Sequence, residues 1–191
     1  MPTATDRRVL VPGDWVRLAA AASLAVGGLV LGGLAAALFL LVLGGVMVPR
    51  ALGLPPLLDV PYGVSLLVAA WAAQLEWYRA VPGLDLVVHA ACTGLIAAVA
   101  YQALVRWGLV AGTDDAAPRR AGAGVVVATT ALGALVAVLW EIGEWAGHSF
   151  LDDGISVGYT DTVTDLASGL VGAMVAGAFL ARRRPEPDVR P

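Results

Sequence analysis

Long apolar runs constrain the fold of this chain more than any other feature of its sequence. A helix needs about 20 predominantly apolar residues to cross the hydrocarbon core of a bilayer, and four segments reach that length. Hydrophobic residues make up 59% of the 191 residues and charged residues 14%, against about 25% charged in soluble domains. We therefore predict an all-α fold, a polytopic transmembrane helix bundle. Its four clear spans are Leu18–Val48, Leu84–Trp107, Ala121–Trp145 and Thr162–Ala181.

A fifth apolar segment, Tyr62–Tyr78, is shorter and lies between residues that interrupt helices. Prolines up to Pro61 precede it and Pro82–Gly83 follow its end, and both are breaker signals. The segment could cross the membrane obliquely or lie half within it, so we expect four to five spanning helices. Gln74 and Glu76, near its end, are expected at the solvated interface.

The length of the chain fits one compact helical domain. We predict a tail at 1–17, a single transmembrane helical domain at 18–181 and a disordered cytoplasmic tail at 182–191, which is too polar to bury. The first apolar run exceeds the ~7–15 apolar residues of a signal peptide, so it is expected to stay as a membrane anchor. Polar connections are expected at Gly108–Arg120 and Gly147–Thr160.

The arginines indicate an orientation, because they gather on the cytoplasmic side of membrane proteins. They flank the Gly108–Arg120 connection and follow the last span, whereas Gly147–Thr160 has no arginine and two aspartates. We predict a multi-pass protein of the bacterial cytoplasmic (inner) membrane with its C-terminus in the cytoplasm. Arg7, Arg8 and Arg17 favour the same side for the N-terminus, which five full crossings do not allow.

Three of the predicted spans carry pairs of ionisable residues at ends that share one side of the membrane. Within each pair the residues are three or four positions apart, so they share a helix face. Ionisable residues inside spans normally face the bundle interior and find partners there. The six residues are Asp85, His89, Glu141, Glu144, Asp161 and Asp165.

These five carboxylates and one imidazole have no arginine or lysine among them to offset their charge. Protonation or a bound cation could do so, and we favour a cation because protonation alone does not explain why so many acids gather. All six residues are predicted ligands of a divalent metal cation of unknown identity. The imidazole suits Mn²⁺, Fe²⁺ or Zn²⁺, and a subset of carboxylates alone suits Mg²⁺ or Ca²⁺. Glu144 and Glu141 are the predicted catalytic residues.

Structural roles stay open for several polar residues. Asp85 and Asp161 also suit the first turn of a helix, and His89 alone would fit a hydrogen-bonded packing role. His148 is expected to be exposed, within reach of a substrate at the mouth of the site. The tryptophans near span ends are interpreted as interfacial anchors and Cys92 as a small buried apolar residue.

Three fragments taken together resemble a known family. They are DLVVH at Asp85–His89, WEIGEW at Trp140–Trp145 and DTVTDLASGLVGA at Asp161–Ala173. Their order and spacing are similar to the YjdF-type family of uncharacterised bacterial inner-membrane proteins, and more loosely to VanZ-like membrane proteins. Val88 stands where the YjdF-type pattern often has glycine. The resemblance covers a little under half of the chain and implies a shared polar centre without a reaction.

Three classes of function are compatible with this sequence. The first is a metal-dependent hydrolase or transferase that acts on a lipid-type substrate, with the cation activating water and Glu144 as base. The second is a proton- or ion-coupled transporter that uses the same acidic cluster. The third is a structural membrane protein. No HExxH motif supports an enzyme. Membrane lipid is the expected partner, the net charge of −3 argues against nucleic acid, and protein partners are unknown.

Overall fold

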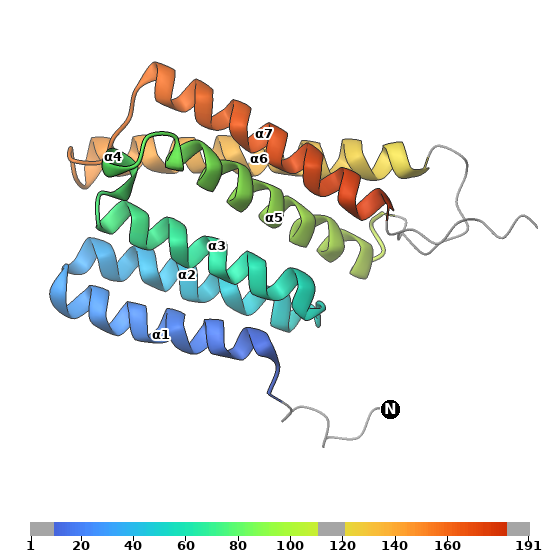
Figure 1. Ribbon diagram of the computed structural model, residues 1–191, viewed down its shortest axis with the longest axis horizontal. Coiled ribbons are helices and arrows are strands. Elements are labelled where there is room, and N and C mark those ends of the chain that lie inside the picture. The colour runs from blue at the N-terminus through green and yellow to red at the C-terminus, as the bar shows by residue number, and fades with distance from the viewer. Residues whose placement is uncertain (1–9, 111–120, 183–191) are drawn as a thin grey trace, which may run out of the picture. The chain divides into compact units, whose positions relative to one another are not determined.

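The computed structural model describes residues 10–110 and 121–182, and within these ranges all regular structure is helical (Figure 1). The predicted all-α fold class is confirmed. Six helices have the length and apolar character that a membrane crossing requires, so the prediction of four to five spans was too low. The helices are α1 (Pro12–Val30), α2 (Gly33–Ala51), α3 (Pro56–Gln74), α4 (Trp77–Ala80), α5 (Leu84–Arg106), α6 (Ala121–Phe150) and α7 (Tyr159–Arg182).

The apolar run predicted as one span, Leu18–Val48, forms two antiparallel helices, α1 and α2. It is longer than the ~17–25 residues that one crossing uses, so a straight helix would extend beyond the bilayer. The chain reverses at Gly32, whose φ of 97° is accessible to glycine and costly for residues with a Cβ. This turn accounts for the first additional span.

Prolines begin α3 instead of interrupting it. Pro55 is the N-cap residue and Pro56 the first helical residue, where the missing N–H costs no intrahelical hydrogen bond. Pro61 lies inside the helix, which continues to Gln74. The segment predicted at Tyr62–Tyr78 is therefore a full-length candidate span that begins at Pro56, and the short helix α4 covers its predicted end.

The described residues form two compact units, the first ending at Trp77 and the second beginning at Tyr78. The predicted boundaries of a single domain at 18–181 stay a prediction, although α1 already begins at Pro12, within the predicted tail at 1–17. In the first unit, α1, α2 and α3 pack around Phe39, which is fully buried. Its ring lies 4.8 Å from that of Trp71, centroid to centroid.

In the second unit, α5 and α7 pack directly against each other and both contact α6 (Figure 1). The two backbones touch because both helices carry glycine where they meet. A Cβ atom on Gly94 would lie 2.6 Å from the carbonyl oxygen of Gly172, and one on Gly172 would overlap the carbonyl oxygen of Ala90. This contact holds α5 against α7 near the middle of both helices, beyond His89 and Asp165 along each chain segment.

Candidate metal centre

Three of the six predicted site residues meet where α5 and α7 begin. His89 Nε2 lies 3.4 Å from Asp85 Oδ1, one turn earlier in α5, and 3.9 Å from Asp165 Oδ2 in α7. One ligand atom from each residue can be chosen so that all lie within 4.8 Å of one another. The close contact of α5 and α7 thus brings one imidazole and two carboxylates together.

The spacing of these atoms is compatible with a common metal ion. In a tetrahedral site, the bonds from the metal to nitrogen and oxygen ligands are about 2.0–2.2 Å long. Two neighbouring ligand atoms therefore lie about 3.3–3.6 Å apart. The 3.4 Å distance from His89 to Asp85 falls in that range, and the 3.9 Å distance to Asp165 exceeds it by a few tenths of an ångström. The three ligand atoms lie within 4.8 Å of one another, so side-chain movements on the order of 1 Å would place all three residues on one ion.

Asp165 is the most deeply buried residue of this group, with 3% of its surface exposed. Its Oδ1 atom accepts no hydrogen bond from any described residue. A buried carboxylate oxygen without a partner is costly, because it has lost its hydration and gained nothing in return. The other oxygen of the same carboxylate, Oδ2, lies 3.9 Å from His89 Nε2. A carboxylate buried in this way calls for a positively charged or hydrogen-bonding group.

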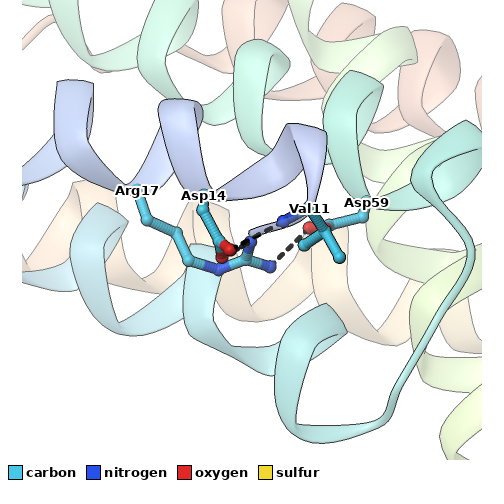
Figure 2. Close-up of polar contacts among 4 residues, drawn as sticks. All are labelled: Val11, Asp14, Arg17 and Asp59. Carbon is cyan, nitrogen blue, oxygen red and sulfur yellow. Dashed lines mark hydrogen bonds and ion pairs between the residues drawn. The ribbon is translucent and has the colours of Figure 1, made fainter. Parts of the chain in front are cut away.

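The chain neutralises another buried acid in a different way, within the first unit (Figure 2). Asp59 is 5% exposed and accepts a 2.7 Å hydrogen bond from Arg17 Nη2. Arg17 Nη1 donates to Asp14 at 3.0 Å, and Asp14 also accepts a hydrogen bond from the backbone N–H of Val11. The carboxylate of Asp59 is therefore paired with a guanidinium, whereas the carboxylate of Asp165 lies beside an imidazole.

The other three predicted ligands do not belong to this group. Asp161 lies in the first turn of α7 and is half-buried. Glu144, also half-buried, is near enough to interact electrostatically with His89 and Asp165, and Glu141 interacts in the same way with Glu144. Spacing along α6 and α7 predicted these residues at the same end, and the structure places them around the three-residue group.

Tyr78 is a nearby residue that the sequence did not indicate. It lies in α4 and interacts electrostatically with Asp85, Glu144 and Asp165. Burial raises the pKa of its phenol above the ordinary value, and the nearby carboxylates raise it further. Tyr78 therefore stays neutral and keeps its proton. No motif or spacing in the sequence indicated this position, because Tyr78 lies at the end of a predicted apolar segment.

Several individual expectations need correction. His148 is half-buried instead of exposed, and its Nδ1 lies 2.8 Å from the carbonyl oxygen of Ile155. The interfacial position of Trp71 stays a prediction; its ring packs against Phe39, and its Nε1–H donates to Ser23 Oγ at 3.0 Å. Cys92 is half-buried instead of buried.

Arg17, which the sequence indicated only as a charge flanking the first span, forms an ion pair with Asp59. In the structure Arg17 is 8% exposed and connects α1 with α3. Gly13 permits this arrangement, because a Cβ atom there would overlap the carboxylate of Asp59. An aspartate inside an apolar segment, as at Asp59, is the sequence signal that could have revealed the pair.

The fold and the polar group define the class of this chain as a polytopic helical membrane protein with six candidate spans. A family model described as "Predicted membrane protein (DUF2238)" matches residues 15–186, and the chain belongs to that family. No curated protein and no solved structure matched the chain.

Proposed function

We propose that this membrane protein binds a divalent cation between α5 and α7 through Asp85, His89 and Asp165. The observation that carries the proposal is the buried, unpartnered Oδ1 of Asp165 beside a second carboxylate and an imidazole. A cation at this position would neutralise the two acids, as Arg17 neutralises Asp59 in the first unit. The remaining acids around the group would strengthen its attraction for positive charge.

The ligand types indicate the class of metal. One imidazole with two carboxylates suits Mn²⁺, Fe²⁺ or Zn²⁺ better than Mg²⁺ or Ca²⁺, which prefer oxygen ligands alone. Three protein ligands leave at least one coordination position for water or a substrate. An open position is typical of catalytic sites, so the arrangement is compatible with hydrolysis or group transfer on a lipid-type substrate.

For such a reaction we propose Glu144 as the general base and Glu141 as an acid that tunes it. Glu144 interacts electrostatically with His89 and Asp165 without joining the group of three. A carboxylate next to a metal-bound water, and not itself a ligand, can accept a proton from that water.

The six candidate spans support the predicted cytoplasmic C-terminus and favour the same side for the N-terminus, which the sequence left open. An even number of crossings returns the chain to the side where it began, which removes the conflict that five crossings created. The N-terminal arginines, the Gly108–Arg120 connection and the arginines after α7 then share one side, and the aspartates between α6 and α7 lie on the other. We propose a bacterial inner-membrane location on this basis, and a YjdF-type assignment within the family on the basis of the three fragments that resemble it.

Replacing single residues tests which of them bind the metal. We expect His89→Gln to weaken Mn²⁺ binding by about 100-fold, since a lost ligand should cost at least as much as a lost outer-shell partner. Glu144→Gln and Asp161→Asn should each weaken it by less than about tenfold, through lost electrostatic attraction only. The measurement is a titration of purified protein in detergent, followed by Mn²⁺ electron paramagnetic resonance.

The control for this titration is Asp153→Asn, which changes an exposed acid in the α6–α7 connection. Its affinity should equal that of the wild type. Equal affinities for His89→Gln and Asp153→Asn would contradict the proposed site.

A further inference from the structure

The packing below the three-residue group bears on how a cation could reach it. One turn deeper in α5, Thr93 is 6% exposed, and its Oγ1 would lie 3.0 Å from a Cβ atom on Gly169 of α7. Further along, the contact between Gly94 and Gly172 leaves no room even for a methyl group. The two helices are therefore in direct contact immediately below His89 and Asp165.

Helix α6 packs against both α5 and α7 along one side of this region. A Cβ atom on Gly133 would overlap that of Ala173 in α7 and would lie 3.4 Å from Cβ of Ala97 in α5. Ala97 and Ala173 are both fully buried. Small apolar groups from three helices thus fill the space that continues from the three-residue group toward the other end of the unit.

Polar groups do not continue through this packed region in the described part of the second unit. Beyond Asp165, its buried side chains with polar atoms are Thr93, Tyr101 and Thr129, and none of them carries a charge. Thr129 Oγ1 has no hydrogen-bond partner among the described residues. A divalent ion that entered this region would lose its hydration and find no replacement ligands.

We infer that the site is a pocket with one entrance, so that a cation enters and leaves where α5 and α7 begin and the protein retains it instead of transporting it. This inference rests on the proposed function, because it concerns the same cation. The ligand would be a hydrated ion taken from the aqueous phase at that end. The packed region formed by Thr93, Ala97, Gly133 and Ala173 separates it from the other side of the membrane.

The inference is tested in proteoliposomes that contain a Mn²⁺-quenched dye. Mn²⁺ is added outside, dye quenching is followed over time, and bound Mn²⁺ is measured on the same preparation after the free ion is removed. An ionophore added at the end shows that the dye responds. Asp165→Asn and His89→Gln proteins serve as variants with a damaged site, and protein-free liposomes give the background.

We expect Mn²⁺ to bind to the wild-type protein and not to the two variants, while quenching in all three stays at the background rate. Quenching above background that disappears in either variant would overturn the one-entrance pocket and leave the cation site in place. Absence of bound Mn²⁺ in the wild type would overturn the proposed cation site itself, and the inference with it.

Discussion

Asp59→Ala is expected to lower the free energy of unfolding by about 3 kcal/mol. Removing one partner of a buried ion pair typically costs about 3–5 kcal/mol, because it leaves the other charge buried without compensation. Arg17 would keep its contact with Asp14, which places the expected loss at the lower end of that range. The measurement is denaturant unfolding of the purified protein in detergent, followed by tryptophan fluorescence.

Two comparisons make this result specific. Asp153→Ala removes an exposed carboxylate and should change stability by less than about 0.5 kcal/mol. A double variant, Arg17→Met with Asp59→Leu, replaces the ion pair by apolar side chains and should recover most of the loss. If Asp59→Ala were as stable as Asp153→Ala, the ion pair would not hold α1 to α3 in the way described.

Gly172→Ala should have an effect of similar size in the second unit. The added methyl group would overlap the backbone carbonyl of Ala90, which cannot move without separating α5 from α7. Overpacking of this kind typically costs about 1–3 kcal/mol, and a backbone obstacle places the expected loss near the upper limit. Because the same contact holds His89 beside Asp165, Mn²⁺ binding should weaken together with stability.

Gly124→Ala is the matched control for this change. Gly124 lies in α6 with nothing within 4 Å of the position where a Cβ atom would stand. Its replacement should leave both stability and Mn²⁺ binding unchanged or slightly improved, since alanine favours helix over glycine by about 1 kcal/mol. Equal behaviour of the two alanine variants would show that the α5–α7 contact is looser than the structure indicates.

The sequence predicted the polar end of the second unit well, for a simple geometric reason. Alternating directions of successive spans placed the start of α5, the end of α6 and the start of α7 on one side, whatever the total number of spans. Spacing of three or four residues then showed which side chains share a face of one helix. It could not show how each helix is rotated, and so it did not separate Asp165, which joins the group of three, from Asp161, which does not.

The sequence was less informative about the first unit. A single glycine, Gly32, divides a continuous apolar run, and hydrophobicity alone does not reveal where such a run turns. Prolines act as breakers in most contexts, but Pro55 and Pro56 stand where a helix begins. The sequence around Arg17 does not show whether its side chain reaches water or pairs with a buried acid. Only the packing of α1 against α3 distinguishes these cases.

Metal content is the most direct test of the central claim that a divalent cation binds between Asp85, His89 and Asp165. Wild-type protein and Asp165→Asn are purified in parallel without chelators and analysed by inductively coupled plasma mass spectrometry. We predict about one equivalent of a transition metal in the wild type, as expected for three ligands on one ion, and nearly none in the variant. Equal metal content in the two folded proteins, or none in either after Mn²⁺, Fe²⁺ and Zn²⁺ have each been supplied, would contradict the claim.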